Sequence, residues 1–517
     1  MTGSSDGRVF AVFLRRHWRT QASSSVSNLP SFGFTSSTAN AGRSFPGSYK
    51  QTAFFRRVPR GLQMNAGHVS SPLLIILPGG SGREAVLRRI LATLDRPVAV
   101  LVPRRLQEAS AWAKPLCSAW IECERLDPEE AWTAVSEWMA RTRQRVAGCT
   151  TWDEWGIEIC AYLCAAERLN LPYTPLATVR QVRNKVRFRE ACGKAGVPTP
   201  RFANAHTEDE LLRVLEKDWS YPLILKPARG AGSYYCRKVE AKDELLEVFA
   251  AFDGQLRSEG KTPEEDVRGG WILEEWFSGW EVDVDGWAKD GQVEWMLVSD
   301  NKPLQSHACC EMGGVYPSQL PEHLQELLRE LTRQVHHPKN RPVAAVVVVR
   351  ASPGLHSVFH FEALVNLETQ EVMPVELNLR VGGAECPCCV EAVSGVFLPL
   401  MAARLAIPSV LDQSPVQALE APQVQVAAST NEYAQHKGVV EACEGSEELY
   451  SDPSFLGAAF FATKGSSYEP LRGAMSCLAW LAAGGRDANE AEQNLQRCLS
   501  FCSLKVLPVS EPASEMT

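Results

Sequence analysis

The sequence has no uninterrupted apolar run that approaches the roughly 18 residues of a membrane-spanning helix. It also has no excess of basic residues, because 53 Lys and Arg are outnumbered by 61 Asp and Glu, which gives a net charge of −8. The first absence argues against a membrane protein, and the second removes the usual electrostatic signal of nucleic-acid binding. We therefore expect neither a membrane nor a nucleic acid among the partners.

Paired metal-binding motifs of the CxxC type are also missing, although the chain has 16 cysteines. The cysteines are scattered, apart from Cys309-Cys310 and the run Cys386-Pro387-Cys388-Cys389. Adjacent cysteines rarely close an unstrained disulfide. We therefore expect reduced thiols in an intracellular protein, in preference to a zinc site.

The first 64 residues differ in composition from the rest. Up to Met64 the segment holds nine Lys or Arg and one acidic residue, Asp6, and it is rich in serine. An Arg-rich, Ser-rich and acid-poor beginning is typical of an organelle transit peptide. An ordinary disordered tail and a true start at Met64 are the alternatives. We expect residues 1–70 to lie outside the fold, with a mitochondrial or plastid location if they form a transit peptide and a cytoplasmic location otherwise.

The segment that follows alternates strands with helices. An apolar run at residues 72–77 leads through the glycine-rich turn at 79–82 into an expected helix, Glu84–Leu94, and a second strand covers Val98–Val102. This alternation predicts an α/β fold, in which helices cover both faces of a parallel sheet. The glycine-rich turn lacks the lysine of a P-loop, so alone it is a weak phosphate-binding signal. Two more helices are expected at 128–143 and 154–168.

The rest of the chain is richer in expected strands. A run of glycine and prolines at 196–200 ends a predicted helix that starts at Thr178. Thr207 and Glu210 have the spacing of a capping box, which predicts the start of another helix. The remaining expected strands are 221–227, 233–239, 271–275, 281–288, 293–298, 343–350, 357–364 and 372–377, and the remaining helices are 243–252, 391–405 and 490–499.

The strongest chemical signal is the run PVELNLRVGG at residues 374–383. Side chains alternate between the two faces of a strand, so Glu376, Asn378 and Arg380 point the same way. Carboxylate and amide oxygens suit Mg²⁺, and a neighbouring arginine suits a phosphate or a carboxylate. If the preceding strand pairs with this one, Glu362 lies beside Glu376. The sequence therefore predicts a magnesium-binding face, in preference to a solvated polar strand.

Two lysines are candidate phosphate ligands. Lys226 ends an apolar strand, where a lysine without an anionic partner would be costly. The loop Arg229–Ser233 follows, and its backbone N–H groups could fold over phosphates. Lys185 lies on an expected helix, where the alternative is an ordinary exposed lysine.

A hinge between two expected strands covers residues 273–281, with the sequence LEEWFSGWE. Such a hinge can present backbone groups to the edge of an adenine, with Glu274 accepting from the adenine amino group. Glu281 could accept from ribose hydroxyls. The alternative is a charged loop that carries core aromatic residues.

Taken in this order, the two lysines, the glycine-containing loop, the hinge, Glu362 and the Glu376–Arg380 run resemble the ATP-grasp superfamily. Within it they are most similar to carboxylate–amine ligases, a group that includes amino-acid and dipeptide ligases. The resemblance spans about residues 72–500. It implies an α/β fold (α+β in the nucleotide-binding part), with a Rossmann-like pre-ATP-grasp domain at 71–175, the ATP-grasp domain at 176–415 and a closing segment at 416–517.

The resemblance also implies roles for individual residues. ATP and Mg²⁺ (or Mn²⁺) would be the cofactors, a small carboxylate and an amine the substrates, and a homodimer the expected assembly. Arg380 would be catalytic, stabilising the acyl-phosphate and the tetrahedral species that follows it. The metal ligands would be Glu362, Glu376 and Asn378, and the ATP-binding residues would be Lys185, Lys226, Arg229, Gly230, Gly232, Ser233, Glu274, Trp276, Phe277 and Glu281.

The implied function is formation of an amide or peptide bond through an acyl-phosphate, with release of ADP and phosphate. The run Val381–Glu385 stands where biotin-dependent carboxylases have a bicarbonate-handling segment, which argues against a carboxylase, and D-alanine ligases typically have no arginine at position 380. The alternatives are another metabolic ATP-grasp ligase, such as one of the purine pathway, and a regulatory protein that binds ATP without turnover. Glu311, Glu385 and His307 are weak candidates for a general base.

Overall fold

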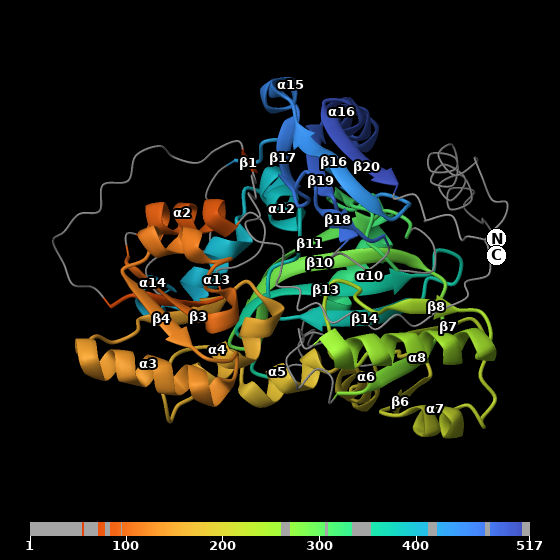
Figure 1. Ribbon diagram of the computed structural model, residues 1–517, viewed down its shortest axis with the longest axis horizontal. Helices are drawn as coiled ribbons and strands as arrows, with labels where there is room; N and C mark the ends of the chain where they lie inside the picture. The colour runs from red at the N-terminus through yellow and green to blue at the C-terminus, as the bar shows by residue number, and fades with distance from the viewer. Residues whose placement is uncertain are drawn as a thin grey trace, which may run out of the picture.

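The computed structural model describes residues 54–55, 71–77, 83–94, 96–259, 269–304, 309–332, 353–411, 421–470 and 476–508. The glycine-rich turn at 79–82, the expected strand at 343–350 and His307 lie outside these residues. Within them the chain forms four sheets, and strands of the largest sheet lie in the middle of the view in Figure 1.

The first unit is a parallel sheet in the order β4-β3-β2-β5. All four residues of β2 are fully buried, as expected for a parallel strand that is covered on both faces. Helix α3 begins after Asp127, whose carboxylate accepts hydrogen bonds from the backbone N–H groups of Glu129 and Glu130. The unit comprises β2 (Leu73–Ile76), α2 (Arg83–Leu94), β3 (Val98–Pro103), β4 (Ala119–Cys123), α3 (Pro128–Thr142), β5 (Gly148–Thr151) and α4 (Ile157–Cys164), with short 3-10 turns at Arg104–Leu106, Ala111–Leu116 and Glu154–Gly156.

The second unit is a small antiparallel sheet in the order β6-β9-β7-β8. Thr207 caps α7 by accepting a hydrogen bond from the N–H of Glu210, which confirms the predicted helix start. The strands are β6 (Phe202–Ala205), β7 (Leu223–Pro227), β8 (Arg237–Val239) and β9 (Trp271–Glu275), and the helices that accompany them are α5 (Leu176–Arg183), α6 (Lys185–Lys194), α7 (Glu208–Val214) and α8 (Lys242–Glu259).

The third unit is a nine-stranded sheet in the order β1-β17-β19-β15-β12-β11-β10-β13-β14. Strand β12 pairs with both β11 and β15, so the C-terminal strands extend the sheet that carries the predicted metal face. The elements up to residue 411 are β10 (Trp280–Lys289), β11 (Gln292–Asn301), β12 (Gly314–Tyr316), α10 (Glu322–Thr332), β13 (Ser357–Val365), β14 (Val372–Asn378), α12 (Cys386–Ser394), α13 (Leu398–Leu405) and α14 (Pro408–Leu411).

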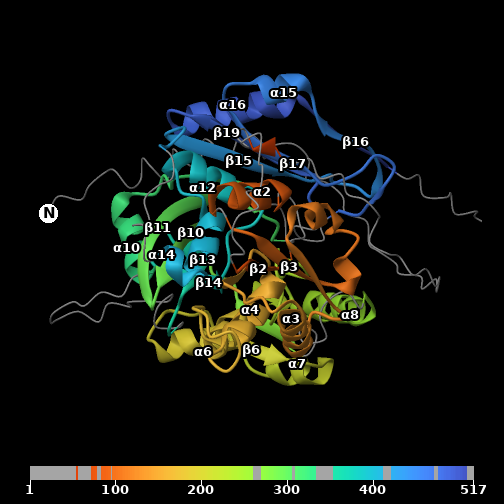
Figure 2. The same cartoon turned by 90° about the vertical axis from the view of Figure 1, so that its left-hand side faces the viewer.

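The C-terminal part covers one end of this sheet and adds a fourth, three-stranded sheet in the order β18-β16-β20. Figure 2 shows it above the parallel sheet, with α6 and α7 below. The backbone of Phe54–Phe55 (β1) pairs with β17, although the sequence analysis placed residues 1–70 outside the fold. The remaining elements are β15 (Val426–Glu432), β16 (Gly438–Gly445), α15 (Glu447–Ser451), β17 (Phe455–Phe460), β18 (Ser467–Tyr468), β19 (Ala479–Gly485), α16 (Ala488–Ser500) and β20 (Cys502–Pro508).

Three predicted elements were wrong in extent. The helix expected at 178–200 is two helices, because Asn184 leaves helical geometry and caps α6 by accepting from the N–H of Arg187. The helix expected at 391–405 is likewise interrupted, since Gly395 ends α12 in a left-handed conformation. The strand expected at 233–239 is reduced to β8, because Ser233 and Tyr235 have φ angles of 53° and 58°, which no strand contains.

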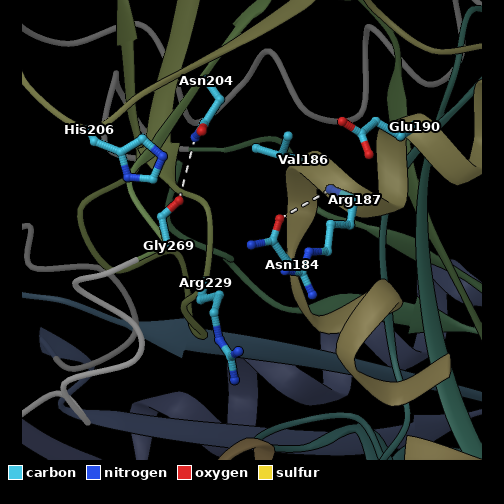
Figure 3. A pocket seen from close by; sticks show the side chains of 8 residues that line it. All are labelled: Asn184, Val186, Arg187, Glu190, Asn204, His206, Arg229 and Gly269. Atoms are coloured by element: carbon cyan, nitrogen blue, oxygen red, sulfur yellow. Dashed lines mark hydrogen bonds between the residues drawn. The ribbon is translucent and has the colours of Figure 1, made fainter. Parts of the chain in front are cut away.

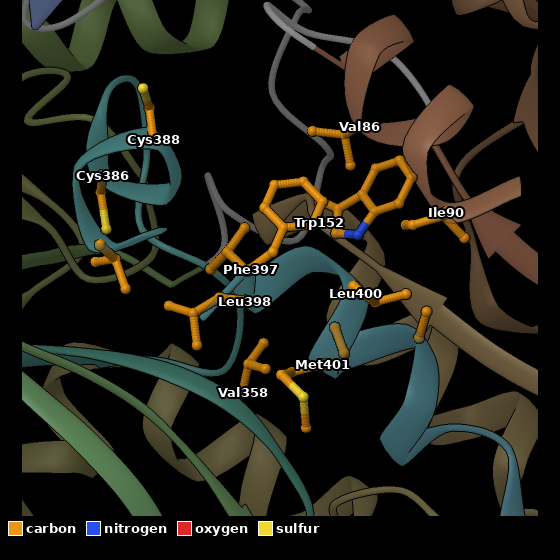
Figure 4. Packing of buried hydrophobic residues seen from close by; sticks show 14 of the residues in the cluster. Val86, Ile90, Trp152, Val358, Cys386, Cys388, Phe397, Leu398, Leu400 and Met401 are labelled. Atoms are coloured by element: carbon orange, nitrogen blue, oxygen red, sulfur yellow. The ribbon is translucent and has the colours of Figure 1, made fainter. Parts of the chain in front are cut away.

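A hydrophobic core joins the parallel sheet to the large sheet. Val86 and Ile90 of α2 and Trp152 pack in one cluster with Leu400 of α13 and Val358 of β13 (Figure 4). Among the described residues no single helix is long and apolar enough to cross a membrane. The bent pair α12 and α13 passes that test by length and composition only, and most of its side chains are buried in this core.

Candidate active site

Strands β10, β13 and β14 carry a row of acidic side chains on one face of the large sheet. Asp283 on β10 lies opposite Glu362 on β13, and Glu362 lies opposite Glu376 on β14. Two residues along each strand, and therefore on the same face, Asp285 lies opposite His360. Residues directly opposite each other in antiparallel strands share a face of the sheet. The row is therefore a continuous acidic surface, which we call the acidic face.

The predicted metal ligands come together on this face. The Asn378 amide Nδ2 donates to Glu376 Oε1 at 2.9 Å and to Glu362 Oε1 at 3.3 Å. The expected position of Glu362 beside Glu376 is thus confirmed. The strand register shifts between Glu362 and Ala363, and Pro374 lies at this bulge on the edge strand β14. Bulges and edge strands are where a sheet tolerates proline.

Lys185 brings one positive charge to the acidic face. Its Nζ lies 2.6 Å from Glu376 Oε2. Burial opposes charge on both groups, but the lysine holds the pKa of Glu376 well below its usual range, and Glu376 in turn raises the pKa of Lys185. Burial and the negative charge of Glu376 raise the pKa of Glu362. The face therefore holds more negative charge than Lys185 compensates.

Lys226 forms an ion pair with Glu274 of the hinge. Its Nζ lies 2.7 Å from Glu274 Oε2, and Arg189 Nε donates to Glu274 Oε1 at 2.5 Å. All three side chains are buried. Burial opposes ionisation, yet Arg189 and Lys226 lower the pKa of Glu274 to about 2. This carboxylate is thus engaged by two cations, and the adenine contact predicted for it stays a prediction.

Arg380 is held by a residue that the sequence analysis missed. Its Nε donates to Glu154 Oε2 at 2.9 Å, and its Nη1 donates to the backbone carbonyl of Val381 at 2.8 Å. The backbone carbonyl of Glu154 also accepts a hydrogen bond from Arg183 Nε at 3.1 Å. It belongs to the parallel-sheet unit, more than two hundred residues before Arg380 in the chain, so no local pattern could have indicated this contact.

The glycine-containing loop follows Lys226 along the chain, and the hinge contains Glu274. Gly232 and Ser233 have φ angles of 63° and 53°, which gives the loop a compact turn. Arg229 Nη2 lies 2.8 Å from Glu158 Oε2 on α4. The Trp276 N–H donates to the carbonyl of Pro222 at 3.1 Å. The predicted contacts of the loop with phosphates, and of Trp276 and Phe277 with adenine, stay predictions.

Glu281 lies on β10 two residues before Asp283, so its side chain points to the same side of the sheet as the acidic face. Burial and the nearby charges of Glu362, Asp283 and Glu311 raise its pKa well above the usual range. Its predicted ribose contact is untested. The alternation Glu281-Val-Asp283-Val-Asp285 on one strand was a signal for the acidic face that the sequence analysis did not use.

Two weak general-base candidates, the half-buried Glu311 and the buried Glu385, are carboxyls with shifted pKa values. Burial and the charge of Glu362 raise the pKa of Glu311 to about 7. Burial also raises the pKa of Glu385 to about 7, and Glu385 Oε1 accepts a hydrogen bond from Ser429 Oγ at 3.1 Å. The charges of Arg380 and Glu376 also act on the pKa of Glu311, which is consistent with a position near the acidic face. Glu385 lies farther along, at the start of α12.

A pocket of about 430 Å³ lies beside the site, at the start of α6. Figure 3 shows Asn184, which caps α6, and Arg187 of α6 on one side and Asn204, His206 and Gly269 on the other. Its lining contains no residue of the acidic face and neither candidate lysine. We therefore locate the chemistry at the acidic face, where the candidate ligands converge, and not in this pocket.

Comparisons with known proteins match two regions of the chain to described domains. Residues 219–388 match the model of the ATP-grasp domain, and residues 433–504 match that of the L-amino acid ligase C-terminal domain 2. Carnosine synthase 1 of Gallus gallus is 29% identical over 333 residues, which are 62% of this chain and 34% of that protein. The chain thus spans about a third of the length of that curated relative.

Solved structures show the same fold. An L-amino acid ligase from Bacillus licheniformis superposes with a TM-score of 0.67 at 19% identity, over 86% of this chain and all of that one. The biotin carboxylase domain of the Hydrogenobacter thermophilus 2-oxoglutarate carboxylase, solved with MgADP and bicarbonate, has a TM-score of 0.59 at 15% identity, over 85% of this chain and 92% of that one. The chain is therefore similar to the ATP-grasp superfamily, whose domain model residues 219–388 match and whose fold the solved structures share. Within that superfamily it is similar to the carboxylate–amine ligases, carnosine synthase among them.

Proposed function

We propose that the protein is an ATP-dependent ligase that joins a small carboxylate to an amine through an acyl-phosphate. One observation carries the proposal. Lys185, Glu362, Glu376 and Asn378 converge on the acidic face, and the charges of both carboxylates act on Arg380. A divalent cation, a phosphate and a carboxylate substrate could therefore meet within one cluster of this fold.

The donor set fits magnesium. Glu362, Glu376 and Asn378 offer the oxygen ligands that a hard cation prefers. Burial and, after it, the negative charge of Glu376 raise the pKa of Glu362, and a bound cation would offset both effects. When bound, Mg²⁺ would supply positive charge that stabilises the developing charge on phosphoryl oxygens.

The chain's own residues would then bind and orient the reactants. Lys185 and Lys226 would exchange part of their present contacts with Glu376 and Glu274 for contacts with the phosphates of ATP. The planar guanidinium of Arg380 can bind a carboxylate at two points. It would also stabilise the negative oxygen that develops when the amine attacks the acyl carbon.

The second step needs a neutral amine and no competing water. A carboxyl with a pKa near 7 is well matched to accepting a proton from an ammonium group, and Glu311 near Arg380 has such a pKa. The loop at residues 228–236 would close over the phosphates. That closure would protect the mixed anhydride from hydrolysis.

Two alternatives were left open by the sequence, a purine-pathway ligase and a regulatory protein that binds ATP without turnover. The match of residues 433–504 to an L-amino acid ligase domain favours an amino acid among the substrates over a purine-pathway acid. The intact set of candidate ligands favours turnover over ATP binding alone. We therefore propose an amino acid as one substrate.

The test is phosphate release by the full chain with ATP and Mg²⁺, across pools of amino acids and small carboxylates. We expect release that needs both an acid and an amine, with the amide product detected by mass spectrometry. Arg380→Ala should lose this release while retaining ATP binding. ATP binding without release from any acid–amine pair would favour the regulatory alternative.

A further inference from the structure

An aspartate, a histidine and a cysteine meet where the large sheet contacts α12. Asp285 lies on β10, His360 lies opposite it on β13, and Cys386 is the first residue of α12. His360 Nδ1 lies 2.9 Å from Asp285 Oδ1. One ligand atom from each of the three residues lies within 4.8 Å of those from the other two. Three kinds of metal-binding group thus converge from three elements of the fold.

The protein encloses this cluster. The side chains of Asp285, His360 and Cys386 are all buried, and that of Asp285 is fully buried. Asp285 Oδ2 is a buried oxygen that has no hydrogen-bond partner among the described residues. Burying a carboxylate oxygen without a partner is costly, so an unpartnered one needs an explanation. A bound cation would supply the missing partner.

Gly382 leaves room beside the cluster. A Cβ at this position would clash with Cys386 Sγ and would lie 3.1 Å from Asp285 Oδ1. The space that a side chain would fill therefore borders two of the three ligand atoms. In a tetrahedral zinc site with bonds of about 2.0 to 2.3 Å, the ligand atoms lie roughly 3.3 to 3.6 Å apart. Small rotations of the three side chains would bring their ligand atoms to this spacing.

The ligand atoms suit zinc better than magnesium. Zn²⁺ is bound by cysteine sulfur, histidine nitrogen and carboxylate oxygen, whereas Mg²⁺ prefers oxygen ligands alone. Cys386 would bind as the thiolate, releasing one proton, and His360 would bind as the neutral imidazole. The negative charges of the thiolate and of Asp285 would then equal the charge of the ion. No net charge would be buried, which removes much of the cost of placing an ion inside a protein.

We propose that Asp285, His360 and Cys386 form a zinc site between the large sheet and α12. In zinc sites with three protein ligands, a water molecule completes the tetrahedron. The zinc site is distinct from the proposed magnesium site, which offers only oxygen atoms to its ion. The three residues are far apart in the sequence, so the search for paired cysteine motifs gave no sign of them.

The zinc ion would hold α12 against the sheet and would orient a neighbouring residue of the acidic face. His360 Nε2 lies 3.5 Å from Glu362 Oε1. A histidine that binds a metal through one ring nitrogen commonly donates a hydrogen bond from the other nitrogen to a carboxylate. With Nδ1 on the ion, Nε2 would donate to Glu362, which is a candidate magnesium ligand. This consequence rests on the proposed function, whereas zinc binding does not.

The first measurement is the zinc content of the full-length protein, which is expressed with added Zn²⁺ because the site is buried, and purified without chelators. We expect about one zinc ion per chain. Cys386→Ser should hold at least about tenfold less, since even the loss of a group that orients a ligand costs that much affinity. Cys388→Ser is the matched control, because Cys388 is a buried thiol of the same helix that points away from Cys386 (Figure 4). Glu376→Gln, which changes the proposed magnesium site, should also keep its zinc.

The second measurement replaces zinc by cobalt, in protein expressed with added Co²⁺. A thiolate bound to Co²⁺ gives a charge-transfer band in the near ultraviolet, which oxygen ligands do not give. The wild type and Cys388→Ser should show this band, and Cys386→Ser should lack it. If Cys386→Ser does not fold, the spectrum of the wild type still decides whether a thiolate binds the metal.

Three results would overturn the zinc site. These are a wild type without the cobalt band, a folded Cys386→Ser that keeps its zinc, and loss of the zinc in Glu376→Gln but not in Cys386→Ser, which would assign the ion to the oxygen atoms of the acidic face. The proposed function fails separately. A protein that holds zinc through Cys386 but releases no phosphate with any acid–amine pair would retain this site and lose the ligase.

Discussion

Lys185 Nζ lies 2.6 Å from Glu376 Oε2, so a candidate phosphate-binding lysine is paired with a candidate metal ligand. Neither group is neutral in this contact, because each shifts the pKa of the other toward its charged form against the effect of burial. Lys185 therefore neutralises part of the negative charge of the acidic face before any ligand binds. Binding of the nucleotide and its metal ion would replace this pairing by contacts of each group with the opposite charge on the ligand.

Glu376→Gln should reduce phosphate release by about 100-fold or more, since it removes a charge that the proposed metal ion needs. The amide keeps the shape of the side chain. Initial rates measured over a range of Mg²⁺ concentrations should show a weaker dependence on the metal. Glu371→Gln is the matched control, because Glu371 is exposed just before the same strand. This variant should release phosphate at the wild-type rate. An unchanged metal dependence in Glu376→Gln would argue against this metal site.

Arg380→Lys should lower kcat more than it changes the KM for ATP. Lysine keeps the positive charge but loses the planar guanidinium, which now contacts both Glu154 and the Val381 carbonyl. Steady-state kinetics with the acid and the amine identified in the release assay would measure both constants. Arg486→Lys, on an exposed side chain, serves as the control. A rise in the KM for ATP with unchanged kcat would instead assign Arg380 to nucleotide binding.

Glu274 should make folding stability depend on pH. Its pKa falls from 4.5 to about 2 on folding, so the stabilisation is fully present above pH 4.5 and is lost as the pH falls toward 2. The shift corresponds to roughly 3 kcal/mol. Urea unfolding at several pH values should show the wild type losing about this much relative to Glu274→Gln, so that the two proteins converge in acid. A constant difference across this range would contradict the prediction, and Glu275→Gln is the neighbouring control.

The convergence of Glu362, Glu376 and Asn378 could be predicted because its signal is local. Glu376 and Asn378 are two residues apart on one strand. To place Glu362 beside them, the prediction had only to assume that two neighbouring strands pair, and the register confirms that they do. Glu154 could not be predicted, because it reaches Arg380 from another unit of the fold. The compact turn after Lys226 was also hidden, since the left-handed conformations of Ser233 and Tyr235 run against the preference of both residue types.

Glu311 should control the rate of the amine step below neutral pH. Burial and the charge of Glu362 raise its pKa to about 7, so its basic form is present above pH 7 and is lost as the pH falls. The rate should therefore rise with pH through about 7. Glu311→Gln should lower the rate and remove this rise, measured at saturating ATP, acid and amine. Retention of the same pH profile in the variant would exclude Glu311 as the group responsible.

The two glycines after Arg380 should differ in their tolerance of a side chain. A Cβ on Gly382 would lie 2.3 Å from Cys386 Sγ and 3.1 Å from Asp285 Oδ1, whereas a Cβ on Gly383 would meet nothing within 4 Å. Because Cys386 and Asp285 are both buried, the contact cannot be relieved by a flexible surface group. Gly382→Ala should therefore destabilise the fold by about 1–3 kcal/mol, the usual cost of overpacking a core. Gly383→Ala should leave the thermal unfolding midpoint nearly unchanged. If both variants unfold like the wild type but lose phosphate release, these glycines serve the close approach of a ligand to the backbone and not the packing of α12 against the acidic face.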